Sequence, residues 1–253
     1  MDLVFLHANG FNALTYRRIL EPLAADFRIL AVDQRGHGAS SLPTQADGRS
    51  DWDDFRDDLI ALIETLDLRH VVLSGHSLGG TAALLAATAS GERVRRVLLF
   101  DPVIAPRGGG GAGGEAHSTL IEGARRRRAE FPSRAAALAA YRGRGAFASW
   151  PDDMLADYVE AGFRDTPGGA VRLACEPAWE ASTFLAQGSD PWAALAAARC
   201  RVEIIKAERN STCHVSEAVG SITVEIVPGT SHFLPMERPA LATEGLRRAM
   251  TES

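Results

Sequence analysis

The stretch VVLSGHSLGG, residues 71–80, places a serine among glycines directly after an apolar run. Gly75, Ser77 and Gly79 fit the pattern Gly-x-Ser-x-Gly, and TAALLAATA, residues 81–89, continues as a run typical of a helix. A serine on so tight a turn takes a strained backbone, and glycines two residues to either side let strand and helix approach closely. The pattern therefore favours a layered α/β domain with this hydroxyl exposed at the carboxyl end of a strand. The alternative is a glycine-rich turn with an incidental serine.

Short apolar runs alternate with amphipathic segments in the first half of the chain, a pattern typical of a mainly parallel sheet covered by helices on both faces. The runs that predict strands are residues 3–7, 28–33, 71–75, 97–101, 202–207 and 223–229. The sheet should therefore have about six strands.

The β signal disappears for about a hundred residues between Asp101 and Val202. Helix starts are indicated there at Ser133, Pro151 and Asp190. We predict an inserted helical cap over residues 105–198, entered through a flexible glycine-rich linker, PRGGGGAGGE, at 106–115. The core is predicted to consist of residues 1–104 and 199–253.

Bulk properties exclude several classes of protein. The formal net charge is -5 and the pI is near 5.8, and no basic face accompanies this balance, so we expect no nucleic-acid partner. No apolar run approaches the roughly 20 residues of a membrane span, and the first residues lack a signal-peptide pattern, so we expect a cytoplasmic protein. Cys175, Cys200 and Cys213 show no metal-ligand spacing, which predicts inert thiols and no metal site.

A serine hydroxyl needs a general base and a third group that orients this base. His232, in PGTSHFLPMERP at residues 228–239, follows the last predicted strand, where a loop can project an imidazole over the sheet edge. We therefore predict His232 as the base of Ser77. His7 is expected to support its loop, and His37 is expected to be a turn residue.

Together with FLHANGF (5–11), DQRGHGAS (33–40) and LLFDPV (98–103), these stretches resemble the α/β-hydrolase-fold serine hydrolases that carry a helical cap. The resemblance covers nearly the whole chain. It implies an acyl-serine mechanism that needs no cofactor. It also implies that the backbone N–H groups of Asn9 and Leu78 form the oxyanion hole. The alternative for Asn9 is a purely structural turn residue.

The acid of the triad departs from the commonest pattern of this family, which places it after the penultimate strand. There this chain offers Glu208, followed by Asn210 and Ser211. A minority of the family carries the acid one strand earlier, where Asp101 ends a predicted strand. We predict Asp101 as the acid and keep Glu208 as the alternative. A further alternative is that Asp101 only holds the start of the cap.

The strand at residues 3–7 begins almost at Met1, so the two strands that precede it in the family have no sequence here. The resemblance therefore implies a short sheet with an exposed edge. There are two alternatives for this edge. Another chain covers it, as in a homodimer, or the natural start of the protein lies upstream of Met1.

The predicted function is hydrolysis of an ester, thioester or similar acyl bond. In this family, dehalogenases and epoxide hydrolases use an aspartate where Ser77 stands. Alternatives on the same fold are carbon–carbon bond hydrolysis, perhydrolysis and cofactor-free dioxygenation, and a non-catalytic binding protein is another. Apolar side chains over residues 147–192 indicate a small-molecule substrate with an apolar portion, unless they serve only to pack the cap on the core.

Overall fold

The central sheet has six parallel strands in the order β2-β1-β3-β4-β8-β9. The computed structural model describes residues 2–107, 115–218 and 220–252. The strands are β1 (Asp2–Leu6), β2 (Arg28–Val32), β3 (Val71–His76), β4 (Val94–Phe100), β8 (Arg201–Ala207) and β9 (Ile222–Val227). The strands predicted from the sequence are thus confirmed, with small differences at their ends.

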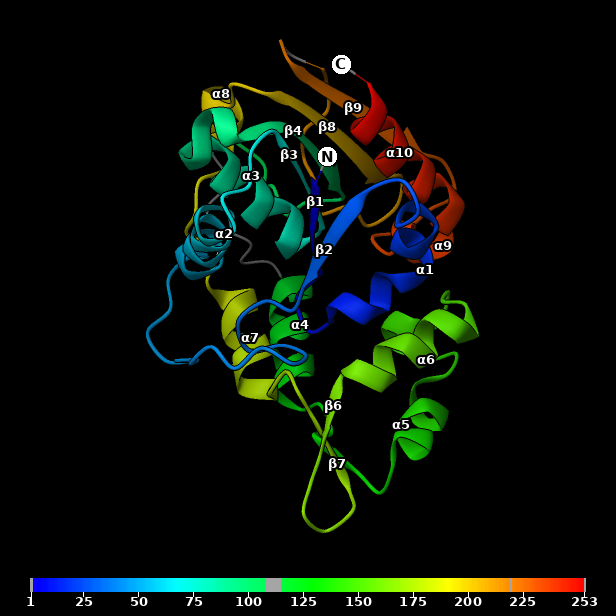
Figure 1. The fold of residues 1–253 in the computed structure, drawn as a ribbon. Helices are drawn as coiled ribbons and strands as arrows, with labels where there is room; N and C mark the ends of the chain where they lie inside the picture. The colour runs from blue at the N-terminus through cyan, green and yellow to red at the C-terminus, as the bar shows by residue number, and fades with distance from the viewer. Residues whose placement is uncertain (1, 108–114, 219, 253) are drawn as a thin grey trace.

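Alternate side chains of the strands enter two separate cores, as the pleat requires. In β1, Leu3 and Phe5 pack into one core, whereas Val4 and Leu6 pack into the other. Helices cover both faces, which explains why the strands read as continuous apolar runs. In Figure 1 one face is covered by α2 (Asp53–Thr65), α3 (Leu78–Ser90) and α8 (Pro191–Ala197), and the other by α1 (Arg17–Leu20) and α10 (Pro239–Thr251).

Parallel register brings the carboxyl ends of the middle strands to one edge. Leu6 pairs with Gly75, His76 with Phe100, and Phe100 with Ile205. The loops that follow β1, β3, β4 and β8 therefore meet at this edge, where open α/β sheets place their sites.

Helices make up most of the segment between β4 and β8, and a small sheet that the sequence did not predict joins them. The helices are α4 (Glu115–Arg125), α5 (Arg134–Tyr141), α6 (Asp152–Ala161), α7 (Pro177–Leu185) and α8. The small sheet is antiparallel, with the strand order β5-β7-β6. Its strands are β5 (Glu130–Phe131), β6 (Phe163–Asp165) and β7 (Val171–Leu173). Strands of two or three residues are too short to show an alternating pattern, so the sequence analysis, which found no β signal in this segment, missed them.

Most of the inserted segment lies beyond the carboxyl ends of the strands (Figure 1), but α8 packs against α3. The limits 105–198 stay a prediction, and residues 108–114 of the predicted linker lie outside the described residues. The large apolar side chains of the insert mainly serve packing, since Trp150, Met154, Leu155 and Tyr158 are buried in the same core as β1 and α10. In the described parts of the chain, no helix is long and apolar enough to cross a bilayer.

Candidate active site

Ser77 occupies the turn between β3 and α3 with φ 56° and ψ −121°. A positive φ is a strained conformation for a residue with a side chain, and it projects the hydroxyl away from both elements. A Cβ atom on Gly75 would lie 2.4 Å from the carbonyl carbon of Gly79, and one on Gly79 would lie 2.4 Å from the carbonyl oxygen of Leu6. Neither position accepts a side chain, which explains the glycines around Ser77.

His232 lies in the loop between β9 and α9 (Leu234–Glu237), with its ring against Ser77. Its Nε2 atom is 3.1 Å from Ser77 Oγ, and its Nδ1 atom is 2.6 Å from Asp101 Oδ2. Because the Asp101 carboxylate only accepts, Nδ1 carries the hydrogen and Nε2 is free to take the proton of Ser77. The loop is fixed by Ser231, whose N–H and Oγ–H donate to the Glu237 carboxylate over 2.7 and 2.6 Å.

Asp101 is fully buried at the end of β4 and has φ 42°. Besides the His232 ring, it accepts hydrogen bonds from the N–H of Ala207 (2.9 Å), Ser211 Oγ (2.6 Å) and the N–H of Thr212 (3.0 Å). Burial raises the pKa of Asp101, but the hydrogen bonds from His232, Ser211 and Ala207 outweigh burial and bring this pKa below its ordinary value. Asp101 is therefore a carboxylate at neutral pH.

Glu208, the alternative acid, is exposed, and its carboxylate accepts from the N–H of Gly229 over 2.8 Å. Among the described residues it makes no hydrogen bond with His232. The loop after β8 contributes Ser211 and Thr212 as donors to Asp101 instead. Sequence reasoning missed this role, although it noted Ser211 where the commoner acid would stand.

The structure brings both residues predicted to supply the oxyanion donors to the site of Ser77. Asn9 lines the same cavity as Ser77, and Leu78 is the first residue of α3. The N–H of a first helical residue has no carbonyl one turn earlier to bond, and the helix dipole favours negative charge there. The Asn9 side chain donates to the carbonyl of Glu180 over 3.0 Å, so the insert helps to hold this loop.

His7 and His37 support the loop of Asn9. His7 Nδ1 lies 2.8 Å from the carbonyl of Ala8, and the N–H of Gly10 donates to His37 Nε2 over 3.0 Å. Burial lowers the pKa of His7 to about 4 and that of His37 well below its usual value, so both rings are neutral. The supporting role expected for His7 agrees with these contacts, and His37 does more than shape its own turn.

A cavity of about 490 Å³ opens onto Ser77 and His232. Apolar side chains from core and insert line much of it, namely Phe11, Val103, Leu120, Phe184 and Phe233. Polar side chains that line it include Asn9, His117, Glu180, Gln187 and His214. In the described part of the chain, no lysine or arginine lines this cavity.

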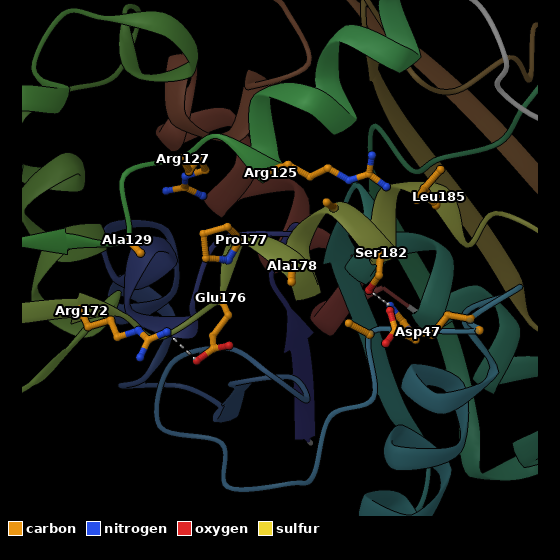
Figure 2. A pocket seen from close by; sticks show the side chains of 14 residues that line it. Asp47, Arg125, Arg127, Ala129, Arg172, Glu176, Pro177, Ala178, Ser182 and Leu185 are labelled. Atoms are coloured by element: carbon orange, nitrogen blue, oxygen red, sulfur yellow. Dashed lines mark hydrogen bonds and ion pairs between the residues drawn. The ribbon is translucent and has the colours of Figure 1, made fainter.

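A second cleft, of about 750 Å³, lies between residues 46–49 and the helices α4 and α7 and is lined by four arginines (Figure 2). Three of them are paired: Arg49 with Asp54 at 2.9 Å, Arg127 with Glu180 at 2.6 Å and Arg172 with Glu176 at 3.4 Å. These pairs leave little net positive charge, so the cleft is a weak candidate for an anion site. The Arg127–Glu180 pair connects the two pockets, because Glu180 lines the cavity of Ser77.

The cysteines have the surroundings of unreactive thiols. Burial raises the pKa of Cys175 well above its usual value and that of Cys213 to about 11. No cluster of histidine, cysteine and acidic side chains in the described residues has the composition and spacing to hold a metal ion.

The strand order, the strained serine turn and the Ser77–His232–Asp101 geometry define an α/β-hydrolase fold. This chain belongs to the alpha/beta hydrolase family, whose model matches residues 3–244, and it is a hydrolase.

Three comparisons show proteins that are similar to this chain, two of them over nearly its whole length. The 2-(acetamidomethylene)succinate hydrolase of Mesorhizobium japonicum is 28% identical over 254 residues, which cover 96% of this chain and 86% of the relative. The crystal structure of E-2-(acetamidomethylene)succinate hydrolase superposes with a TM-score of 0.84 at 26% identity, covering 99% of this chain and 92% of the other. A non-heme chloroperoxidase of Streptomyces lividans is 40% identical, but over 105 residues, 41% of this chain and 37% of the relative.

Proposed function

We propose that this protein is a serine hydrolase that cleaves an ester, thioester or similar acyl bond through an acyl-Ser77 intermediate. The observation that carries the proposal is the Ser77 Oγ to His232 Nε2 distance of 3.1 Å, with the buried Asp101 carboxylate on the other ring nitrogen. This arrangement supplies a nucleophile, a base and a group that orients the base.

The reaction follows from these groups. His232 Nε2 takes the hydroxyl proton as Ser77 Oγ attacks the carbonyl carbon, and the N–H groups of Asn9 and Leu78 stabilise the oxyanion that forms. The imidazolium then gives its proton to the leaving group, which departs as the carbonyl re-forms. Water attacks the acyl-serine by the same two proton transfers and releases the acid. Asp101 stays ionised throughout and stabilises the imidazolium.

The cavity favours a substrate that is uncharged and largely apolar where it contacts the protein. Aromatic and aliphatic side chains line much of the cavity, and the carboxylate of Glu180 is paired with Arg127. A carboxylate on the substrate would find neither a lysine nor an arginine among the described residues that line the cavity. The relative from Mesorhizobium japonicum is named for a succinate, a dicarboxylate, so we propose that this chain differs from it in substrate charge.

The likeness to that relative over nearly its full length favours amides as a second substrate class. The same acyl-serine steps cleave an amide if His232 protonates the departing nitrogen. N-acylated enamines and their uncharged esters therefore belong in the first substrate screen, beside acyl esters and thioesters.

Intact-mass measurement with a fluorophosphonate, a reagent that labels activated serines, tests the proposal. One adduct per chain on the parent and none on Ser77→Ala is the expected result. A folded parent that takes up no reagent, but binds small apolar ligands, would support a binding protein instead. Adduct formation without cleavage in an ester, thioester and amide screen would favour carbon–carbon hydrolysis, perhydrolysis or oxygenation, which chromophoric diketones and oxygen uptake distinguish.

A further inference from the structure

A buried tyrosine connects the loop of Asn9 to the residue that precedes Ser77. The hydroxyl of Tyr16 accepts from the N–H of Ala8 over 3.2 Å and lies 2.7 Å from Nδ1 of His76. Both side chains are fully buried, so water does not compete for these bonds. Neither Tyr16 nor His76 has a role in the chemistry described above.

His76 continues the connection to the loop of the catalytic base. Its Nε2 atom lies 2.8 Å from the carbonyl oxygen of His232. A carbonyl only accepts, so Nε2 carries the hydrogen, and the unprotonated Nδ1 must then accept from the Tyr16 hydroxyl. The direction of every bond in the chain is fixed: Ala8 N–H to Tyr16, Tyr16 O–H to His76, and His76 Nε2–H to His232.

The state of His76 agrees with this assignment. Burial, and next the neighbouring His232, lower the pKa of His76 to about 3, so the ring is neutral at any working pH. Its centroid lies 5.0 Å from that of His232. An uncharged neighbour is needed there, because a cationic ring at this distance would repel the imidazolium that forms on His232 during the reaction.

We propose that Tyr16 and His76 are positioning residues that hold the oxyanion amide of Asn9, the hydroxyl of Ser77 and the imidazole of His232 in register with one another. The three groups come from the loops after β1, β3 and β9, and no single loop fixes their spacing. Tyr16 binds the backbone of Ala8, which directly precedes Asn9. His76 directly precedes Ser77 and binds the backbone carbonyl of His232. A misplacement of about 1 Å between such groups typically costs on the order of 100-fold in rate.

Tyr16→Phe tests the proposal with the smallest change. The ring stays packed 4.7 Å from that of Phe5, while both hydrogen bonds of the hydroxyl are lost. We expect kcat to fall about 10- to 100-fold with KM near the parent value, because the loss acts on the alignment of reacting groups and leaves the cavity intact. Tyr141→Phe is the matched control, since this hydroxyl lies outside the cavity, and its kcat should equal that of the parent.

Substitutions of His76 separate its hydrogen bond to the His232 carbonyl from its hydrogen bond to Tyr16. His76→Gln can still donate to the His232 carbonyl, whereas His76→Ala cannot, so kcat of the Gln variant should lie clearly above that of the Ala variant. Fluorophosphonate labelling should slow in parallel with kcat, counted per folded molecule. The proposal would be overturned if Tyr16→Phe kept the parental kcat and the parental rate of labelling per folded molecule. Equal activities of the Gln and Ala variants would also overturn it.

The tautomer of His76 gives a test that needs no variant to fold. In the parent, two-bond ¹H–¹⁵N spectra should show a neutral ring protonated at Nε2, with unprotonated Nδ1 in hydrogen-bonded contact. A ring protonated at Nδ1, or one that becomes charged near neutral pH, would overturn the assignment. The inference rests on the proposed function for its kinetic test only. Failure of that function leaves the parent unlabelled, whereas failure of this inference leaves parent and Tyr16→Phe equally active.

Discussion

The Nδ1 atom of His232 lies 2.6 Å from Oδ2 of Asp101, the residue that directly follows β4. The proposed acid therefore follows the strand next to β3, which directly precedes Ser77, and the loop after β8 supplies hydrogen-bond donors in place of an acid. A carboxylate with this many donors is rigid, and its charge persists in a fully buried position.

We expect Asp101→Asn to lower kcat by about 10⁴-fold, because an amide favours the wrong tautomer of His232 and does not stabilise its imidazolium. Glu208→Gln should leave kcat near the parent value, since Glu208 bonds only to the backbone of Gly229 in the described contacts. Steady-state kinetics on both variants, with circular dichroism to verify folding, checks this. The reverse ranking would assign the acid to the loop after β8.

The close approach of α3 to β1 predicts a large loss of stability for Gly79→Ala. The new methyl group would lie 2.4 Å from the backbone oxygen of Leu6, which cannot move without shifting β1. We expect a loss of about 3 kcal/mol in the free energy of unfolding, measured with urea. Gly123→Ala, in α4 with no atom within 4 Å of the new methyl group, is the control and should gain about 0.5–1 kcal/mol. Equal stabilities would refute the packing argument.

Glu180→Gln should change the preference for substrate charge. Glu180 lines the cavity and is paired with Arg127 at 2.6 Å, so its loss removes a negative charge from the cavity wall and leaves the charge of the neighbouring Arg127 without this partner. We expect kcat/KM for a nitrophenyl hemisuccinate to rise about tenfold relative to the butyrate ester of the same alcohol. Glu176→Gln, whose partner Arg172 lines the other cleft, is the control and should keep the parental ratio. An unchanged ratio in Glu180→Gln would show that Arg127 does not reach the substrate.

Acid should destabilise the fold through His7. The pKa of this buried ring is about 4, against about 6.5 in an unfolded chain, so the unfolded state binds more protons between these values. Stability is therefore lost as the pH falls from about 6.5 to about 4, by on the order of 3 kcal/mol for this group. Urea titrations at several pH values across that range should show that the free energy of unfolding depends less steeply on pH in His7→Asn than in the parent. The same substitution at the exposed His70 is the control. A pH dependence of stability in His7→Asn equal to that of the parent would contradict the assignment.

Local patterns in the sequence were enough to predict the central sheet and the serine turn. Each strand is rich in branched residues, and the geometry around Ser77 depends on glycines only two residues away. Asp101 was predicted through a family resemblance, because nothing in LLFDPV itself distinguishes a triad acid from a structural aspartate.

Contacts between distant parts of the chain could not be predicted in the same way. Tyr16 and His76 are 60 residues apart, and Asn9 and Glu180 are 171 apart, and no pattern in either partner specifies the other. The strand pair β6 and β7 was missed because three residues show no period. Most aromatic side chains of the insert pack into the core, while Phe184 lines the cavity. This difference depends on the direction in which each helix face points, which the sequence alone does not specify.

Phe11 has a consequence for engineering this enzyme. Its ring makes edge contacts with Trp150 at 5.0 Å and Tyr158 at 5.7 Å, both from the insert, while the neighbouring Asn12 donates to the carbonyl of Tyr158 over 2.9 Å. The loop that carries Asn9 is thus built jointly by the sheet domain and the insert. The insert is therefore not an interchangeable module: a graft from a relative would alter the rate of bond cleavage together with selectivity, unless residues 8–12 were transplanted with it.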